Sequence, residues 1–501
     1  MDIKKQLTQH DLAYASRPAI VFEARQITFS ELRDNSFRVA QYLLARGIKK
    51  ADRVALFLSN TPEAVYSFLG TFSIGGTLIP LDFMLTESEV IHFINHSQAS
   101  VLITQPRRDI DFANIKAACP SVKEIVLMRA ETCAFTPWEE VMKGSTAEPA
   151  VAVSDNDLAA IFYTSGSTGK PKGVMLSYKH LDNPVDTIHH FLTISDKDIF
   201  LTGGVPFSHL GGLDYILLMV RFASTLVLME RFHPLQFLKD IGEHQVTIFC
   251  IVPAMYIAIL SLKEYEKFDL SSLRYAVVFG APSSPQLLQR FHQVCSKAIV
   301  LNGWGMTETA APNTYSPADE RKINSIGQFG FRMTYKIVND DGAEVPVGQR
   351  GELWVKGDGV MVGYYKAPEL TAEVLTADGW LKTGDMAYCD SDGLIYLAGR
   401  KEDMIKVAGE IVFSSEVEEK IHLHPKVKEV AVIGVPDSLR GEVPKAFIAA
   451  KEGEVLDIPE LKEFLKKSLA HFKIPHHFEI VADLPKNRVG KIDKTKLVHR
   501  P

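Results

Sequence analysis

The chain has 501 residues, 46% of them hydrophobic, and a formal net charge of −6 at pH 7. A chain of this length and composition can bury cores large enough for more than one domain, and its acidic balance gives no reason to expect nucleic-acid binding. Its five cysteines lie far apart and form no CxxC pair, which argues against a zinc site and a disulfide framework and favours the reducing cytoplasm.

The first 130 residues alternate between helical and strand-like patterns. Residues 28–32 predict the start of a helix, with Ser30 as its N-cap. Residues 53–58 predict a strand, residues 63–73 a helix and residues 75–81 another strand. The same pattern returns between residues 200 and 300. Such alternation predicts an α/β fold with largely parallel sheets.

No segment predicts a secretory signal or a membrane span. Residues 1–6 contain no apolar stretch. The longest apolar run, residues 246–260, is interrupted by Pro253 and is shorter than the ~20 residues that a membrane-spanning helix needs. This run predicts a buried strand followed by a helix.

Residues 164–173 combine glycines, hydroxyl side chains and lysines directly after an apolar strand pattern at residues 158–163. Glycine lets the backbone approach a small anion closely, and N–H, hydroxyl and ammonium groups bind phosphate oxygens. The spacing differs from the P-loop GxxxxGK[ST], because Pro171 stands where Ser or Thr is required. A flexible Ser/Gly linker is the alternative. The predicted polyphosphate-binding residues are Thr164, Ser165, Gly166, Ser167, Thr168, Gly169 and Lys172.

A second motif, residues 302–309, follows the apolar strand pattern at residues 298–301. Trp304 offers a flat face to a purine, and Thr307 can hydrogen-bond an α-phosphate oxygen. Glu308 is a hard oxygen ligand of the kind that Mg²⁺ prefers. An ordinary glycine turn with an exposed glutamate is the alternative.

Short strand patterns punctuated by glycine and aspartate between residues 326 and 399 predict a β-barrel-like subdomain. Within it, Asp385 ends a Thr-Gly-Asp sequence, and its carboxylate can accept two hydrogen bonds from the vicinal diol of a ribose. Such a sequence alone is a common turn. After Arg400 the charge balance changes from net acidic to nearly neutral, which predicts one domain of residues 1–400 and a second of residues 401–501.

These motifs, in this order from about residue 20 to residue 495, resemble those of the adenylate-forming superfamily. The superfamily comprises acyl- and aryl-CoA synthetases, adenylation domains of peptide synthetases and beetle luciferases. The resemblance implies a large N-terminal adenylation domain, with two α/β subdomains and a small β-barrel-like one. A small, mobile α+β C-terminal domain is expected to follow.

For the nucleotide, the resemblance implies that the adenine lies between Trp304 and the turn at residues 280–282, with Asn302 near its exocyclic amine. Trp304 stands where the family more often has tyrosine, and it keeps a stacking surface. Asp385 and Arg400 match the family's ribose-site aspartate and the arginine of its Gly-Arg pair. The nucleotide-binding residues implied here are Gly280, Ala281, Pro282, Asn302, Gly303, Trp304, Gly305, Met306, Asp385 and Arg400.

The resemblance assigns catalytic roles to Thr307, Glu308, Lys491 and His209. Lys491 matches the lysine of the family's C-terminal Gly-Lys pair, which bridges the acid and the α-phosphate. A positioned ammonium cancels the repulsion between these two anions. His209 matches the His or aromatic residue at the mouth of the acyl pocket, although a lone His more often has a structural role.

Two further positions are implied in the C-terminal domain. Glu402 occupies the hinge position, where the family has Asp or Lys, and the adjacent Asp403 could share its role. Gly409 matches the glycine that lines the pantetheine tunnel, where a side chain would block the thiol.

The resemblance places the acyl pocket around residues 207–214. Ser208 replaces the aspartate with which amino-acid-activating relatives hold the ammonium, which disfavours an α-amino acid. Two glycines replace larger residues and favour a roomier pocket for aliphatic or larger acyl groups, whereas Asp214 could meet a polar substituent or face solvent. The pocket residues are Gly211, Gly212, Asp214 and Phe279.

The sequence therefore predicts an AMP-forming acid–thiol ligase, an acyl-CoA synthetase that uses ATP, Mg²⁺, CoA and a small-molecule carboxylic acid. Its C-terminal domain rotates between the two half-reactions. A stand-alone adenylation enzyme that loads a carrier protein and a non-catalytic nucleotide-binding homologue are the alternatives. The acid and the oligomeric state, with a homodimer as one option, stay open.

Overall fold

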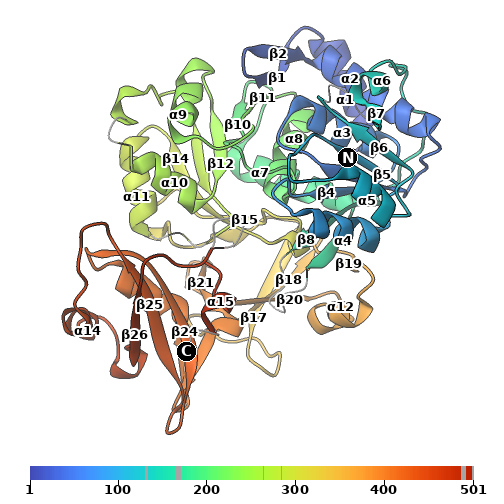
Figure 1. The fold of residues 1–501 in the computed structure, drawn as a ribbon. Coiled ribbons are helices and arrows are strands. Elements are labelled where there is room, and N and C mark those ends of the chain that lie inside the picture. The colour runs from blue at the N-terminus through green and yellow to red at the C-terminus, as the bar shows by residue number, and fades with distance from the viewer. Residues whose placement is uncertain are drawn as a thin grey trace. The chain divides into compact units, whose positions relative to one another are not determined.

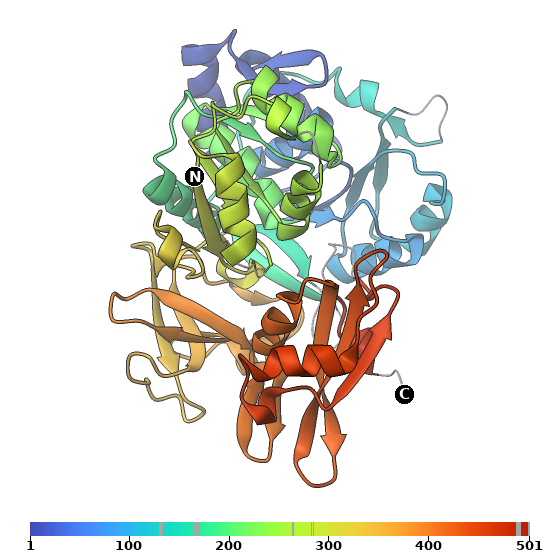
Figure 2. The same ribbon diagram turned by 90° about the vertical axis from the view of Figure 1, so that its left-hand side faces the viewer.

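The computed structural model describes residues 1–129, 134–164, 171–262, 265–281, 283, 285–486 and 492–498. Contacts divide the chain into two compact units, one of residues 1–323, 329–334 and 356–379 and the other of residues 324–328, 335–355 and 380–501. The first unit is built on two mostly parallel sheets with helices, and the second on largely antiparallel sheets (Figures 1 and 2). The predicted division after residue 400 concerns which part moves as a body, and it stays a prediction.

The first sheet of the larger unit has a parallel centre with antiparallel edges. Helices α9 (Pro234–Glu243), α10 (Pro253–Leu260) and α11 (Pro285–Val294) share one apolar core with its strands. The apolar run at residues 246–260 forms strand β12 and helix α10, as predicted. The strand order is β16 (Gln328–Phe329), β15 (Thr314–Tyr315), β14 (Ile299–Trp304), β13 (Tyr275–Val278), β12 (Ile248–Ile251), β10 (Ile199–Leu201), β11 (Thr225–Leu228), β1 (Pro18–Phe22) and β2 (Arg25–Thr28).

The second sheet of this unit has parallel strands from β8 to β7 and antiparallel strands at its other edge. Alternate residues of its strands, such as Ala55 and Phe57, join one core with α4 (Glu87–Ser97) and α5 (Phe112–Ala118). The strand order is β19 (Gly363–Tyr364), β9 (Lys172–Ser177), β8 (Leu158–Thr164), β4 (Thr77–Leu81), β3 (Arg53–Phe57), β5 (Val101–Thr104), β6 (Glu124–Leu127) and β7 (Thr136–Pro137).

Helix α2 (Phe29–Ala45) begins two residues earlier than the sequence pattern predicted. The predicted N-cap, Ser30, is wrong, because Thr28 occupies that position. The Thr28 hydroxyl accepts a hydrogen bond from the Glu31 N–H at 3.2 Å, and the Glu31 carboxylate accepts one from the Thr28 N–H at 2.8 Å. This reciprocal capping box satisfies more of the free N–H groups than a cap at Ser30 would.

The remaining helices of this unit pack on and around the sheets (Figure 1). Helix α3 contacts strands β3 and β4 and lies along α2, and α8 contacts β11, α7 and α1. The bounds are α1 (Ile3–Tyr14), α3 (Pro62–Ser73), α6 (Trp138–Val141), α7 (Asp182–Leu192), α8 (Leu210–Phe222) and α12 (Pro368–Val374).

The smaller unit contains the β-rich segment expected before residue 400, which forms most of a four-stranded antiparallel sheet. Its strands run in the order β17 (Met333–Val338), β18 (Gly351–Gly357), β20 (Leu381–Cys389) and β21 (Ile395–Arg400). The segment after residue 400 forms a second sheet and packs its helices on it, which agrees with the predicted α+β texture. That part holds β22 (Met404–Val407), β23 (Glu410–Phe413), α13 (Ser414–His422), β24 (Val427–Asp437), β25 (Gly441–Ala450), α14 (Ile458–Lys466), β26 (His477–Val481) and α15 (Thr495–Val498).

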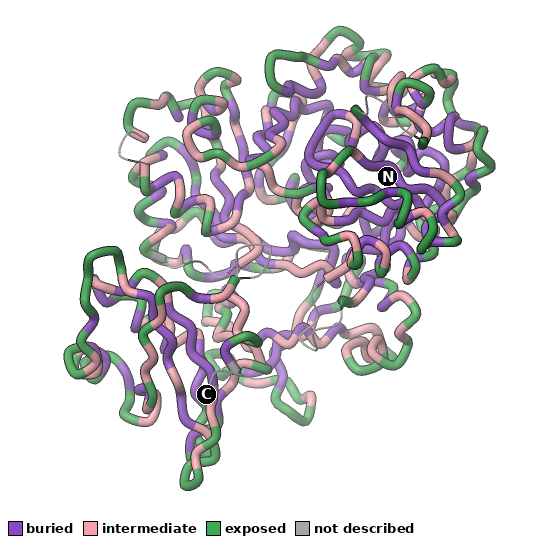
Figure 3. The backbone as a smooth tube through the Cα atoms, viewed as in Figure 1, coloured by how far each residue is buried: buried purple, intermediate pink, exposed green. Residues whose placement is uncertain are grey.

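The central strands of the sheets are buried, and the exposed residues gather in loops and on outer helix faces (Figure 3). The four described cysteines, Cys119, Cys250, Cys295 and Cys389, are all free. Within the described ranges, no helix combines the length and apolar character that a bilayer crossing requires.

Candidate active site

A β-hairpin holds the two ends of the predicted phosphate loop. Thr164 is the last residue of β8, Lys172 is the first of β9, and the two lie opposite each other in the antiparallel register. Five predicted phosphate ligands between them, Ser165, Gly166, Ser167, Thr168 and Gly169, lie outside the described residues. The hairpin nevertheless positions both ends of the loop at one edge of the sheet.

Tyr364 connects this loop to the second motif. The Lys172 ammonium lies 5.1 Å from the centre of the Tyr364 ring, a cation–π distance. The Tyr364 hydroxyl donates a hydrogen bond to Glu308 Oε1 at 2.9 Å, and the Met361 N–H donates one to the Glu308 carbonyl at 2.9 Å. Glu308 is 8% exposed. Lys172 and Glu308 are far apart in the sequence. The fold brings Lys172 to the ring of Tyr364 and Glu308 to its hydroxyl.

Sequence reasoning missed Tyr364. The residue lies in β19, which pairs with β9 and so adds an edge strand beside the phosphate hairpin. Its only local signal is a Gly-Tyr-Tyr sequence in a β-rich segment, which is too short to indicate a site.

The second motif runs from the end of β14 into a short 3₁₀ helix at Thr307–Thr309. The Asn302 N–H donates to the Ser316 hydroxyl at 2.9 Å, and Gly303 and Trp304 pair with β15. Trp304 is 7% exposed, and its ring meets Phe329 edge-on with centroids 5.5 Å apart. The predicted stacking of adenine on Trp304 stays a prediction.

Close packing shapes the turn that presents Thr307 and Glu308. A Cβ at Gly305 would lie 2.5 Å from the Ala311 Cβ, so only glycine fits there. The Met306 N–H donates to the Thr309 hydroxyl at 3.0 Å, and the Asn183 amide donates to the Ala310 carbonyl at 3.1 Å. These contacts hold the turn rigidly on the sheet.

The predicted adenine turn begins directly after β13. Gly280 has φ of +84°, the left-handed region that favours glycine, and a Cβ there would be 3.4 Å from Val252. Ala281 is half-buried. Pro282 lies outside the described residues, so the assignment of this turn to adenine stays a prediction.

The loop before α8 carries His209 and is held by a residue that the sequence did not single out. The Asn60 amide donates to the Val205 carbonyl at 2.7 Å, and its oxygen accepts from the Phe207 N–H at 3.0 Å. Asn60 is 3% exposed. It therefore links the end of β3 to the predicted acyl loop, and a single asparagine after a strand gives no signal for this role.

His209 is the N-cap residue of α8 and lies near an aspartate. Its Nε2 is 3.7 Å from Asp82 Oδ2, a pair that is ionic only when the imidazole is protonated. The His209 side chain is 42% exposed. The ring is thus partly exposed at the start of the helix while its Nε2 is buried, and its proposed role in the half-reactions stays a prediction.

The two predicted pocket glycines have different surroundings. A Cβ at Gly211 would lie 3.4 Å from the ring of Phe279 and 3.8 Å from Val205, which is ordinary contact. A Cβ at Gly212 would lie 2.2 Å from the Pro206 carbonyl oxygen, so no side chain fits there. The structure brings Gly211 and Phe279 together, whereas Gly212 allows the helix to pack against its own preceding loop.

Replacing Gly211 with tyrosine is expected to shift the enzyme toward smaller acids. The added ring must occupy the space beside Phe279, and overpacking of a well-fitted site costs about 1–3 kcal/mol, or roughly ten- to a hundredfold in kcat/KM for a large acid. The ATP KM should hardly change. Gly211→Ala, whose methyl group fits, is the matched control. An unchanged ranking of acids by kcat/KM would show that residue 211 does not face the acyl group.

In the smaller unit, the two predicted ribose residues lie opposite each other. Asp385 of β20 pairs with Arg400 of β21 in the sheet register. The Arg400 guanidinium donates to Asp385 Oδ1 at 2.8 Å and to the Thr383 carbonyl at 3.2 Å. Asp385 is 8% exposed. The antiparallel sheet thus makes one polar pair from two motifs.

The predicted hinge residue adjoins this pair. Glu402 Oε1 lies 3.7 Å from Arg400 Nε. Lys401 Nζ lies 3.1 Å from Glu352 Oε2 and 3.1 Å from Asp340 Oδ1. Asp403 is 3.4 Å from Lys494. Residues 401–403 form a short 3₁₀ helix whose side chains all make ion pairs, so a change of backbone angle here would break or exchange them. The predicted catalytic Lys491 lies outside the described residues.

Gly409 forms a tight turn between β22 and β23. Ala408 and Gly409 have φ of +50° and +90°, and they connect Val407 and Glu410, which are directly paired. Two positive φ values are typical of a two-residue hairpin turn. Among the described residues, its chain neighbours aside, no atom lies within 4 Å of a Cβ built at Gly409, so the turn is open on that side.

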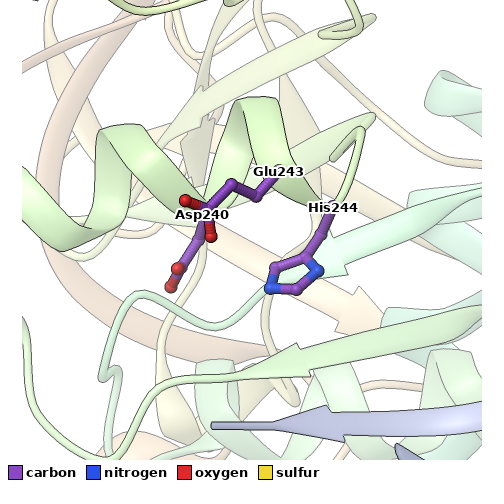
Figure 4. A group of neighbouring side chains, drawn as sticks. All are labelled: Asp240, Glu243 and His244. Carbon is purple, nitrogen blue, oxygen red and sulfur yellow. The ribbon is translucent and has the colours of Figure 1, made fainter. Parts of the chain in front are cut away.

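One group of potential metal ligands lies elsewhere in the larger unit. Asp240, Glu243 and His244 project from the end of α9 with ligand atoms within 4.8 Å of one another (Figure 4). These side chains are exposed or half-buried. They lie at the end of α9, whereas Glu308 lies in the 3₁₀ helix after β14. The magnesium position predicted at Glu308 is therefore a different place.

Known proteins are similar to this sequence over nearly its whole length. The profile of the AMP-binding enzyme family matches residues 7–365, and that of the AMP-binding enzyme C-terminal domain matches residues 416–491. The chain belongs to the AMP-binding enzyme family. The predicted membership of the adenylate-forming superfamily is thereby confirmed.

Relatives of this AMP-binding enzyme include several CoA ligases. A long-chain-fatty-acid–CoA ligase of Bacillus subtilis is 32% identical over 524 residues, covering 98% of this chain and 93% of the relative. A crotonobetaine/carnitine–CoA ligase of Salmonella paratyphi B is 32% identical over 507 residues, covering 97% of both. Among solved structures, an anthranilate CoA ligase with anthranoyl-AMP has a TM-score of 0.91 at 26% identity, covering 99% of this chain and 96% of that one. These similarities confirm the predicted fold class.

Proposed function

We propose that this enzyme is an AMP-forming acyl-CoA synthetase. It activates a carboxylic acid with ATP to an acyl-adenylate and pyrophosphate, and then transfers the acyl group to CoA with release of AMP. The family membership and the CoA ligases among its relatives confirm the ligase class that the sequence predicted. The observation that carries the assignment in this chain is the junction of Lys172, Tyr364 and Glu308.

That junction suits attack at the α-phosphate of ATP. A carboxylate oxygen bonds to the α-phosphorus, and the bond from that phosphorus to the pyrophosphate oxygen breaks. In the second step the CoA sulfur bonds to the acyl carbon and the bond to AMP breaks. In our proposal the loop at residues 164–172 holds the departing pyrophosphate, and the Thr307 hydroxyl binds an α-phosphate oxygen.

The donor set around Glu308 fits Mg²⁺. This ion is commonly held by one or two carboxylates together with substrate phosphates. The Tyr364 hydroxyl occupies one side of Oε1 and orients the carboxylate, which leaves Oε2 for the ion. Glu308 would hold Mg²⁺, which when bound neutralises charge on the phosphates.

We further propose that Asp385 and Arg400 bind the ribose and that residues 401–501 move between the half-reactions. The ion pair of Arg400 with Asp385 keeps the carboxylate in place for a vicinal diol. Glu402, beside Arg400, is the proposed hinge. A rotation there would carry Lys491 toward and away from the acid, and would bring the Gly409 turn to the thiol.

The relatives act on acids of different kinds, including a long-chain fatty acid and carnitine by their names. In this chain Gly211 places no side chain beside the Phe279 ring, which supports an aliphatic or larger acid. We propose a cytoplasmic location on the basis of the cysteine pattern.

The reaction can be tested by measuring pyrophosphate and AMP release with a panel of acids, with and without CoA. Acid-dependent pyrophosphate release and CoA-dependent thioester formation are expected. Acylation of a phosphopantetheinyl carrier protein without turnover on CoA would instead indicate a carrier-loading enzyme. Nucleotide binding without any turnover would contradict the ligase assignment and indicate a non-catalytic homologue.

A further inference from the structure

A buried carboxyl without a partner lies one helical turn beyond Gly211. Asp214 of α8 is 5% exposed, and its Oδ1 is buried with no hydrogen-bond partner in the described structure. Buried polar atoms are nearly always hydrogen-bonded, because leaving one unpaired costs the loss of its hydration. An unpaired carboxyl in a core therefore indicates a ligand that forms a hydrogen bond with it.

The position of Asp214 directs it toward the acyl pocket. Residues three apart lie on the same face of a helix, and helical side chains tilt toward the N-terminus. Asp214 thus shares a face with Gly211 and leans toward the end of α8 that carries His209. Gly211 in turn faces Phe279. Asp214 therefore lies one turn further along the face of α8 that meets Phe279.

The groups behind Asp214 do not satisfy it. The Tyr215 hydroxyl is already engaged, since it donates to the Cys250 carbonyl at 2.8 Å and accepts from the Cys250 N–H at 2.7 Å. The Tyr256 hydroxyl is also buried without a partner. Burial above all, and then the charges of Cys250 and Asp214, raise the pKa of Tyr315, whose ring lies against Gly303 of the predicted nucleotide motif. None of these described groups therefore pairs with Asp214 Oδ1.

The protonation of Asp214 decides what it can bind. Burial raises the pKa of Asp214 well above its usual value, which favours the neutral, protonated form of the carboxyl. A neutral carboxyl both donates and accepts a hydrogen bond. A cationic substituent would have to ionise it and bury an ion pair, whose desolvation opposes binding.

We propose that Asp214 is a specificity-determining residue that recognises an uncharged hydrogen-bonding group, such as a hydroxyl or ketone, on the chain of the acid substrate. This inference rests on the proposed acyl-CoA synthetase function and names the class of acid within it. A site built to hydrogen-bond a substrate hydroxyl discriminates strongly against the analogue that lacks it, because its own buried group is then left unpaired. The favoured substrates are therefore oxygenated acids rather than plain hydrocarbon acids of equal length.

The test compares matched acids of six to ten carbons. Each chain length is assayed as the plain acid and as its hydroxy, keto and amino analogues, by AMP release in the presence of CoA. The wild-type enzyme is expected to prefer a hydroxy or keto acid by about tenfold or more in kcat/KM. Asp214→Leu, of similar size but without polar atoms, should lose that preference, and Asp214→Asn, which still donates and accepts, should keep it.

Two further readouts keep the test decisive. The ATP KM and the unfolding temperature check that each variant retains its nucleotide site and its fold, and if Asp214→Leu does not fold, the wild-type ranking and Asp214→Asn decide. A wild-type preference for plain or amino acids, or a preference that Asp214→Leu leaves unchanged, would overturn the inference. Absence of turnover with every acid would instead contradict the ligase function, and this inference with it.

Discussion

Replacing Lys491 with alanine is expected to slow acyl-adenylate formation by at least about 10²–10³-fold, the scale of removing one positioned charge-stabilising donor. The acid and the α-phosphate are both anions, and the ammonium is the group that offsets their repulsion. Thioester formation from a synthetic acyl-adenylate should be nearly unchanged, because that step begins after the acid and phosphate have joined. The two half-reactions are measured separately, by pyrophosphate exchange and by CoA thioester formation.

Lys496→Ala is the matched control for this experiment. Lys496 lies five residues further on, its side chain is 63% exposed, and it pairs only weakly with Asp493 at 3.4 Å. Its loss should leave both half-reactions intact. If Lys491→Ala slowed both half-reactions equally, the proposal that residues 401–501 hold different positions in the two steps would lose its support.

Gly409→Leu is expected to give the opposite division. A branched side chain in the proposed thiol tunnel should reduce thioester formation by about 100-fold or more, since a small misplacement of reacting groups has that effect. Pyrophosphate exchange should survive, because the turn at Ala408 and Gly409 is proposed to reach the thiol only in the second step. The readouts are the same two assays.

The control must separate bulk from backbone strain. Gly409 has φ of +90°, which any side chain adopts with difficulty. Gly409→Ala introduces that strain without the bulk, because no non-neighbouring atom of the described structure lies within 4 Å of its added Cβ. Alanine should therefore keep most thioester activity, with a similar fall in unfolding temperature for both variants. Equal losses for alanine and leucine, or equal effects on both half-reactions, would reduce Gly409 to a turn residue.

Sequence reasoning could predict those parts of the candidate active site that are formed by contiguous motifs. A loop that surrounds phosphates needs backbone N–H groups and small side chains in unbroken succession, so a phosphate loop from Thr164 to Lys172 could be predicted before the fold was known. The same holds for Asn302 to Glu308. Alternating helix and strand patterns likewise predicted the α/β fold, because burial of one face imposes the period.

Contacts between distant segments could not be predicted. Tyr364 hydrogen-bonds Glu308 only because β19 pairs with β9, and Asn60 holds the predicted acyl loop only because β3 ends beside it. A single tyrosine or asparagine has no local pattern. Helix α2 is a different case, since the Thr28-x-x-Glu31 spacing of its capping box is present in the sequence and favours Thr28 over Ser30.

By itself, then, the sequence determined the superfamily and the ligase chemistry, and it gave the order of the motifs predicted to bind phosphate, adenine and ribose, because these depend on residue type and local spacing. The tertiary structure decided which residues face each other. It placed Gly211 beside Phe279, and it packed Gly212 against the backbone of the loop that precedes α8. It also buried Asp214 Oδ1 without a hydrogen-bond partner among the described residues. Burial and pairing arise from the packing of elements far apart in the chain, and that packing is why a residue with the same local sequence can line a pocket, support a loop or face solvent.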